Sequence, residues 1–376
     1  MRQTEKVALV NGRIHTPAGI VGSLTFGGGR IMETGALPDT STGADGQFRN
    51  DMRVIDLHGR TVLPGFCDAD ARLLQWAVAQ EHALPEGGRP FDDVHPGDED
   101  LAWALRAHAP KLAALGLTEV WSDDLSLFSD DFHRAQGFFT NAAGELPFRL
   151  REQLRLPGDA LSDYLADGWR TGDGTPFCQT GAVVCGTGSG QEDMALDAHL
   201  SGMQLLLDAG GDALEGALGL LERAQERRNT NARHLLRVQS VDGPQSDRVR
   251  KLRAGGIIRP IEGNGESRLD MMRKGIVLAS GSGGTEFVSP LAGIQALVSQ
   301  DAAERLSVAE AIGTFTWNAA WNGRNERRRG ELAPGRDADL VVLDRDPFSA
   351  APEELSGIEV VLTVCGGCVT YDAGKL

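Results

Sequence analysis

The chain has 376 residues, enough for one large α/β domain and a smaller appended one, and its apolar fraction of 41% suits a globular protein. A formal net charge of −16 argues against a nucleic-acid partner or an anionic membrane surface, because both require a basic footprint. Five cysteines, an odd number, in a chain without a charged-then-apolar leader or a long apolar span predict a reducing, cytoplasmic location.

The chain begins with a pattern of short strands. Residues 5 to 35 alternate between apolar and polar positions, and Asn11-Gly12 and Gly27-Gly28-Gly29 are typical of hairpin turns. A further strand is expected at Thr61 to Phe66. We therefore predict a small β-rich unit at the N-terminus.

The middle of the chain alternates between strand-like and helical runs, as a (β/α) barrel requires. Leu101 to Leu115 carries apolar residues at helical spacing, Gly116 ends this helix, and Leu117 to Trp121 is a predicted strand. With Thr61 to Phe66 the expected strands number eight. The other six are Phe148 to Leu150, Ala182 to Cys185, Gln204 to Leu207, Leu235 to Val238, Gly256 to Arg259 and Ile276 to Ala279.

Residues 331 to 374 return to the pattern of short strands. This region contains Cys365-x-x-Cys368, a spacing that also occurs in redox motifs. The two cysteines bracket a Gly-Gly turn between two strands and do not begin a helix, so a structural role is favoured.

Three segments resemble the amidohydrolase superfamily. Leu63-Pro64-Gly65-Phe66-Cys67-Asp68-Ala69-Asp70-Ala71-Arg72 is similar to its first barrel strand, Glu331 to Asp344 to its closing motif, and Val360 to Tyr371 to its last hairpin. The resemblance covers nearly the whole chain and is nearest to the amidohydrolase 3 branch, which contains formamide deformylases. The large insertion of that branch after the first strand is reduced to about residues 80–100.

The resemblance implies an α/β fold: a distorted (β/α)8 TIM barrel with a small β-sandwich built from both termini. The corresponding parts are residues 1–60 for the N-terminal half of the sandwich, 61–330 for the barrel and 331–376 for the C-terminal half.

The positions that hold metal in the family differ in this chain. The His-x-His pair of the first strand is replaced by Asp70 and Arg72, and the lysine of the fourth strand by Val184. The histidines of the fifth and sixth strands correspond to Asp208 and Arg237. The aspartate of Gly-Ser-Asp after the eighth strand is replaced in Gly281-Ser282-Gly283. Because an arginine keeps its charge and cannot coordinate a metal, we expect no metal and no other cofactor.

The inventory of lysines and histidines supports the same expectation. All of them fall outside the predicted carboxyl ends of the barrel strands, where barrel enzymes place their chemistry. They are Lys6, Lys111, Lys251, Lys274 and Lys375, and His15, His58, His82, His95, His108, His133, His199 and His234.

Charged residues have replaced the metal ligands, although simple loss of a site would favour small or apolar side chains. Asp70, Arg72, Asp208 and Arg237 are all expected near the barrel mouth. In one interpretation Asp70 and Asp208 face each other, proximity raises the pKa of one, and the pair performs acid/base catalysis with Arg72. In the other, these residues form a salt-bridged plug.

A ligand of negative charge is expected beside this cluster. The glycine-rich run after the eighth strand, which contains Ser282 and Thr285, lies where barrels commonly bind phosphate through backbone N–H groups. Arg237 and Arg259 offer a bidentate grip on a carboxylate or phosphate. The remaining predicted substrate contacts are Glu262, Glu286 and Trp121, the last with core packing as the alternative.

Three functions follow. The first is a metal-independent enzyme that performs acid/base chemistry, of lyase, isomerase or cyclase type, on a small metabolite. The second is a catalytically inactive binding or regulatory scaffold, and the third is a hydrolase of non-peptide C–N bonds. Covalent catalysis by Cys185 is disfavoured because no histidine is placed to activate it. The expected partners are a small-molecule substrate and a second copy of the chain in a homodimer.

Overall fold

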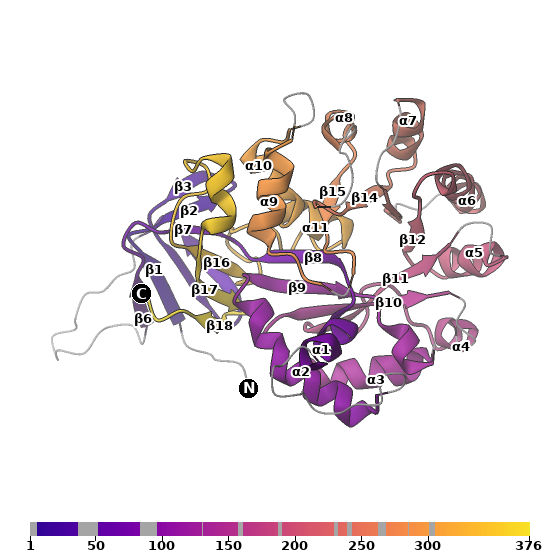
Figure 1. Ribbon diagram of the computed structural model, residues 1–376, viewed down its shortest axis with the longest axis horizontal. Helices are drawn as coiled ribbons and strands as arrows, with labels where there is room; N and C mark the ends of the chain where they lie inside the picture. Colours follow the sequence, from indigo (N-terminus) through magenta and orange to yellow (C-terminus); the bar gives the residue numbers. More distant parts are fainter. Residues whose placement is uncertain are drawn as a thin grey trace.

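The computed structural model describes residues 6–36, 52–82, 96–129, 131–156, 161–186, 190–228, 232–238, 243–261, 268–284, 286–300 and 305–376. An eight-stranded parallel sheet curls into a nearly closed barrel, and two further sheets lie beside it (Figure 1). Of the helices in these ranges, none has the length and apolar character needed to cross a membrane.

The barrel strands follow one another in sequence order, each parallel to the next. Six of them were predicted in position to within a few residues, and the predicted TIM-barrel class is confirmed. The strands are β8 Phe66–Ala71, β9 Leu117–Ser122, β10 Arg149–Arg155, β11 Cys178–Cys185, β12 Leu205–Asp208, β13 Leu235–Arg237, β14 Gly255–Ile258 and β15 Leu278–Ser280.

Helices surround the barrel and bury an apolar face against it (Figure 1). In α6, Leu214, Leu218 and Leu221 recur at helical spacing and are all buried. The helices are α1 Leu73–His82, α2 Asp98–Ala113, α3 Phe132–Ala142, α4 Leu161–Ala166, α5 Glu192–Leu200, α6 Ala213–Arg227, α7 Gly243–Lys251, α8 Arg268–Arg273, α9 Pro290–Val298, α10 Val308–Thr314 and α11 Trp317–Asn322, with 3-10 turns η1 Leu125–Phe128 and η2 Pro352–Gly357.

Both ends of the described chain build the two smaller sheets, as predicted for the sandwich. One sheet has the order β5-β4-β1-β6 and the other β18-β17-β16-β7-β2-β3, and residues such as Leu9, Phe26 and Val342 form their shared core. The strands are β1 Lys6–Val10, β2 Arg13–Thr16, β3 Gly19–Val21, β4 Leu24–Gly27, β5 Arg30–Thr34, β6 Met52–Asp56, β7 Thr61–Pro64, β16 Leu340–Leu343, β17 Val360–Cys365 and β18 Cys368–Asp372.

The prediction that the first barrel strand spans Thr61 to Phe66 is wrong. Residues Thr61–Pro64 form β7, which pairs with β16 and β2 of the six-stranded sheet, and the barrel begins at Phe66. Pro64 and Gly65 separate two strands that the sequence pattern joins into one. We therefore propose that the N-terminal part of the sandwich ends after Pro64.

The barrel closes between its first and last strands through backbone contacts that require glycine. The N–H of Gly283 donates to the carbonyl of Asp70 at 2.6 Å, and a Cβ on Gly281 would lie 2.4 Å from the backbone nitrogen of Asp70. The Asp68 carboxylate accepts the backbone N–H of Ser282 at 3.0 Å and also its hydroxyl. Burial raises the pKa of Asp68 to about 7, although the bonds from Ser282 favour its charged form.

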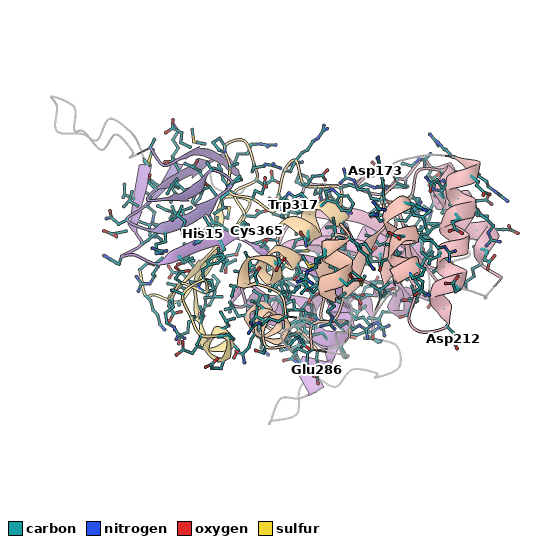
Figure 2. All side chains as sticks on the ribbon, turned by 90° about the horizontal axis from the view of Figure 1, so that it is seen from above. His15, Asp173, Asp212, Glu286, Trp317 and Cys365 are labelled. Atoms are coloured by element: carbon teal, nitrogen blue, oxygen red, sulfur yellow. The ribbon has the colours of Figure 1, made fainter. Side chains whose placement is uncertain are left out.

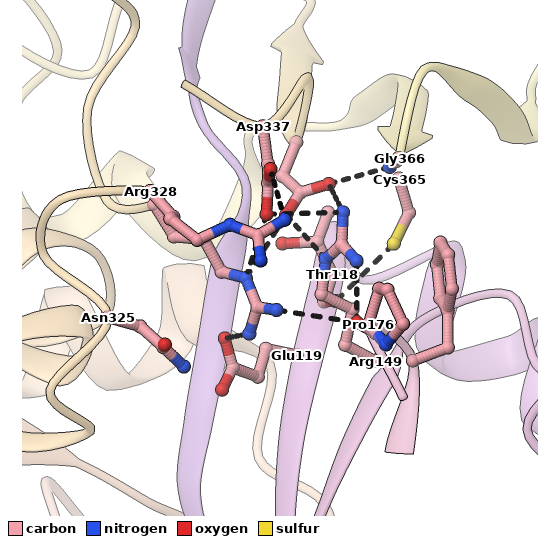
Figure 3. Close-up of polar contacts among 12 residues, drawn as sticks. Thr118, Glu119, Arg149, Pro176, Asn325, Arg328, Asp337, Cys365 and Gly366 are labelled. Carbon is pink, nitrogen blue, oxygen red and sulfur yellow. Dashed lines mark hydrogen bonds and ion pairs between the residues drawn. The ribbon is translucent and has the colours of Figure 1, made fainter. Parts of the chain in front are cut away.

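Buried ion pairs join the barrel to the sandwich at the amino ends of the strands (Figure 3). Arg149 at the start of β10 donates to both oxygens of Asp339, at 2.8 and 3.0 Å, and Asp339 also accepts the N–H of Gly366. Arg329 bridges Glu119 of β9, at 2.9 Å, and Asp337. Burial alone would raise the pKa of Glu119, but the positive charges of Arg329 and Arg151 outweigh it and hold the pKa below its usual value.

Replacing Arg149 with methionine should therefore lower the free energy of unfolding by about 3–5 kcal/mol, because it leaves Asp339 buried without its cation. The measurement is urea unfolding. The double replacement Arg149→Met, Asp339→Leu should recover most of the loss, since both buried charges are then absent. The control Arg134→Met removes an exposed pair with Asp98 and should change stability by less than about 1 kcal/mol. An equal loss in the two single variants would contradict a special role for the buried joint.

Two buried histidines form a chain of polar contacts near the starts of β12 and β13. His199 Nε2 lies 3.2 Å from the carbonyl of Arg228, and its Nδ1 lies 3.0 Å from His234 Nε2. His234 Nδ1 accepts the N–H of Leu205. Both rings satisfy these partners in their neutral forms, and burial together with His199 lowers the pKa of His234 to about 3.

This histidine pair should make the fold sensitive to acid. Because the unfolded His234 takes up a proton near pH 6.5 and the folded one only near pH 3, its contribution is complete above pH 6.5 and declines as the pH falls through that interval. The expected loss is about 2 kcal/mol between pH 7.5 and pH 5. Urea unfolding at the two pH values should show that the free energy of unfolding falls less in His234→Gln than in the wild type, by this amount. If the free energy of unfolding fell equally with pH in the two proteins, the mechanism would be ruled out.

Candidate functional site

Charged side chains gather at the carboxyl ends of the barrel strands, where parallel strands bring distant parts of the chain together. Figure 2 shows this face from the side: Asp212 and Glu286, which follow β12 and β15, lie on one face of the molecule, and Asp173 and Trp317 on the other. Near the carboxyl-end face lie Asp70 of β8, Asp208 of β12, Arg237 of β13 and Arg259 after β14.

Arg237 is the centre of this cluster. Its Nε lies 3.0 Å from Asp70 Oδ1, its Nη1 3.0 Å from Asp208 Oδ1 and its Nη2 3.3 Å from Asp123 Oδ2. Burial alone would lower the pKa of Arg237, but the carboxylates of Asp70, Asp208 and Asp123 outweigh it and raise the pKa above its usual value. The guanidinium is therefore held firmly in its charged form.

The facing pair of Asp70 and Asp208 expected from the sequence does not form as a direct carboxylate pair. Arg237 donates to both, so a cation lies between them.

Two members of the cluster were not among the site residues chosen from the sequence. Asp123 follows β9 and is buried, and Arg155 ends β10 and binds it with Nε at 3.0 Å. Arg155 Nη1 also lies 3.7 Å from Asp208 Oδ2. The Ser122-Asp123-Asp124 sequence after a predicted strand was the signal for Asp123. Arg155 gave no such signal because β10 was expected to end at Leu150.

A cavity of about 220 Å³ opens beside Arg237. Its charged lining is formed by two carboxylates, Asp70 and Asp208, and three arginines, Arg237, Arg259 and Arg268. A second cavity of about 310 Å³, lined partly by Ser282 and Glu286, shares Arg259 with the first. Among the described lining residues of the first cavity, arginines thus outnumber carboxylates, in a chain whose formal charge is −16.

The other predicted substrate contacts are placed in different ways. Ser282 directs its hydroxyl and its backbone N–H to Asp68, so the donors expected to bind an anion already have a partner. Trp121 is 1% exposed, packs in the barrel interior and donates to Glu119, so the structure places it in the core. Glu262 and Thr285 lie outside the described residues.

Arg72 is half-buried next to helix α1, and its carbonyl accepts the N–H of Trp76. Among the described residues that line the two cavities, Arg72 is absent. The structure therefore brings Asp70, Asp208, Arg237 and Arg259 together and leaves Arg72 apart from them.

The nearly closed barrel with a sheet unit at its side defines the class of amidohydrolase-like barrels. An uncharacterized metal-dependent hydrolase from Pyrococcus horikoshii OT3 superposes with a TM-score of 0.73 at 17% identity, over 93% of this chain and 100% of that one. An adenosine deaminase from Xanthomonas campestris with bound zinc gives 0.70 at 14% identity, over 100% and 95%. At these identities the likeness concerns the fold.

A model of the amidohydrolase family matches residues 91–371, and the chain belongs to this family. "Putative amidohydrolase YtcJ" of Bacillus subtilis (strain 168) is 31% identical over 207 residues, which are 46% of this chain and 39% of that protein. An N-substituted formamide deformylase of Arthrobacter pascens is 33% identical over 69 residues, 18% and 13% of the two chains. The matched regions thus span less than half of either relative.

Among the solved structures of this fold, the adenosine deaminase from Xanthomonas campestris holds bound zinc, and the barrel mouth of this chain differs from a metal site in two respects. Within the described ranges, no group of three or more His, Cys, Asp or Glu side chains is arranged to hold a metal ion. The Arg237 guanidinium lies among the carboxylates that such an ion would need. A fixed positive charge there would repel a metal ion.

The Arg259 side chain packs closely against the backbone of Gly283 at this site. A Cβ on Gly283 would lie 1.9 Å from Arg259 Nε, and the φ of Gly283 is +80°, a value that disfavours other residues. Arg259 thus fills the space that a side chain at position 283 would need, which is where the family motif has its aspartate.

Gly283→Ala should destabilise the protein by about 2–3 kcal/mol, from backbone strain and from the clash with Arg259. When Arg259 is already replaced by alanine, Gly283→Ala should lower the free energy of unfolding by only about 1 kcal/mol, from backbone strain alone. Urea unfolding of the four proteins of this cycle gives the coupling. The matched control is Gly284→Ala, whose added Cβ meets nothing within 4 Å. Additive effects of the two replacements would mean that Arg259 and position 283 do not share this space.

Proposed function

We propose that the protein is a metal-independent member of the amidohydrolase family that performs acid/base chemistry, of lyase, isomerase or cyclase type, on a small anionic metabolite. The observation that supports this proposal is the open cavity at the barrel mouth, whose described lining residues combine two carboxylates with three arginines. A cavity at the carboxyl ends of barrel strands is the usual place for chemistry in this fold.

Asp70 is the proposed proton acceptor. Its Oδ1 is bound by Arg237, whereas its Oδ2 accepts no hydrogen bond from the described residues. The side chain is 6% exposed and lines the cavity, and Arg259 Nε lies 3.7 Å from Oδ2. Because this oxygen lacks a hydrogen-bond donor, we propose that it takes up a proton once a ligand is bound in the cavity.

Asp208 is the proposed second acid/base group, because it lines the same cavity and its side chain is 44% exposed. Exposure lets it exchange protons with solvent, while Arg237 fixes its position relative to Asp70. Arg72 remains a proposed participant on the basis of the sequence, although its side chain lies apart from the cavity lining.

Arg259 is the proposed anchor of the ligand's negative group. It is shared by the two cavities and its side chain is 40% exposed, so a carboxylate or phosphate in either cavity can reach it. Guanidinium groups bind these anions with two parallel hydrogen bonds. Glu286, in the second cavity, would contact a polar or positive part of the ligand.

The second candidate function is a catalytically inactive binding or regulatory scaffold. One observation favours it: Arg237 makes ion pairs with three carboxylates, an arrangement that also suits a plug. Binding without turnover would distinguish it from the enzyme.

The third candidate, a hydrolase of C–N bonds outside peptides, rests on the name of the formamide deformylase relative. Release of an amine or ammonia from the ligand would distinguish it. We further propose a cytoplasmic location and a homodimer, for which size-exclusion chromatography with light scattering is the test.

The proposal predicts that purified protein contains less than stoichiometric metal by mass spectrometry and that small carboxylates or phosphates raise its melting temperature. Arg259→Ala should weaken the binding of such a ligand at least about tenfold, because one charge-assisted pair is lost. Arg106→Ala is the control, since it removes an exposed arginine of α2 that pairs with Glu145 and lies away from the mouth. Stoichiometric metal, or equal affinities in the two variants, would refute the proposal.

For any ligand that is converted, Asp70→Asn should lower kcat by about 10²–10⁴-fold with little change in binding, because it removes the proton acceptor and keeps the shape. Thermal unfolding of the variant serves as the control for folding. Full activity in folded Asp70→Asn would contradict the assigned role.

A further inference from the structure

Three carboxylates from separate parts of the barrel meet one guanidinium. Asp70, Asp123 and Asp208 come from β8, the end of β9 and β12, and each accepts from a different nitrogen of Arg237. We call these three side chains the carboxylate cradle. Since the three nitrogens lie in one plane, the cradle surrounds the edge of a flat cation.

Two of the three cradle carboxylates are buried and the third, Asp208, is 44% exposed, so the buried two need cationic partners. The side chains of Asp70 and Asp123 are 6% and 3% exposed, and that of Arg237 is 13% exposed. Carboxylates in such surroundings are strongly destabilised when their cation is removed. Arg155 and Arg259 approach from the sides, but neither is bound by all three carboxylates.

The spacing of the cradle suits a guanidinium and not a metal ion. Its oxygens lie 3.0–3.3 Å from Nε, Nη1 and Nη2 of Arg237, and Asp70 also lies 2.8 Å from Nη2. A small divalent ion requires oxygens about 2.0–2.6 Å from a single centre. The buried carboxylates would have to move inward to provide that geometry.

We propose that the carboxylate cradle is a binding site for a planar guanidinium cation, which Arg237 fills from within the chain. Arg237 thereby serves as the resident cation of the barrel mouth and is a positioning residue: it fixes Asp70 and Asp208 at the cavity edge. This inference concerns the cation and holds whether the mouth is catalytic or only binds a ligand.

The experiment replaces the covalent cation with a free one. Arg237→Ala removes the atoms beyond Cβ, and N-ethylguanidinium has the structure of the removed fragment. The variant should melt roughly 5–10 °C below the wild type, as expected for a buried charge cluster that has lost a partner. Millimolar N-ethylguanidinium should recover a large part of this loss in a saturable way and leave the wild type unchanged.

Arg259→Ala is the matched control, because it removes an arginine that approaches Asp70 from outside the cradle. N-ethylguanidinium should not restore this variant. Recovery of both variants to the same extent, or of neither, would overturn the inference. So would recovery of Arg237→Ala by Mn²⁺ without recovery by N-ethylguanidinium.

If Arg237→Ala does not accumulate as folded protein, refolding from urea tests the same point. The yield of folded Arg237→Ala should rise when N-ethylguanidinium is present during refolding, since alanine leaves the space of the removed fragment empty. Equal yields with and without the cation would overturn the inference.

Discussion

Charge pairing along strands β9 and β10 is the constraint on which the rest of this barrel depends. Arg149, Arg151 and Arg155 lie at successive heights on β10. Arg149 pairs with Asp339, Arg151 lies near Glu119 of β9, and Arg155 pairs with Asp123, which follows β9. Because arginine cannot lose its proton inside a protein, each one requires a carboxylate, a carbonyl or an aromatic face within reach. Arg151 shows all three solutions, with Glu119 nearby, the Gly323 carbonyl and the ring of Trp121.

The same two strands link the two ends of the barrel. At the amino ends their charges join the sandwich to the barrel (Figure 3). At the carboxyl ends Asp123 and Arg155 join the cluster around Arg237. Strands β9 and β10 therefore connect the barrel mouth directly to the ion pairs between the barrel and the sandwich. A stable joint is part of what holds the candidate site in shape.

Much of the fold followed from the sequence, because period-2 and helical patterns mark apolar strands and helices directly. Besides the first barrel strand, the prediction fell short at β10, whose Arg-Leu-Arg-Glu-Gln-Leu-Arg sequence has the charge of an exposed segment although all but its last residue are buried. The cluster of Asp70, Asp208, Arg237 and Arg259 followed from strand ends. The Asp68–Ser282 contact did not, because it joins residues 214 positions apart and no local pattern reports such pairing.

The close fit of Arg259 over Gly283 also restricts how this barrel can change over evolutionary time. With Arg259 present, any side chain gained at position 283 meets an occupied volume, so that single step carries a stability loss. Once Arg259 has been replaced, the same change at position 283 costs less. Geometry therefore favours one order of substitutions, in which Arg259 changes before position 283 regains a side chain.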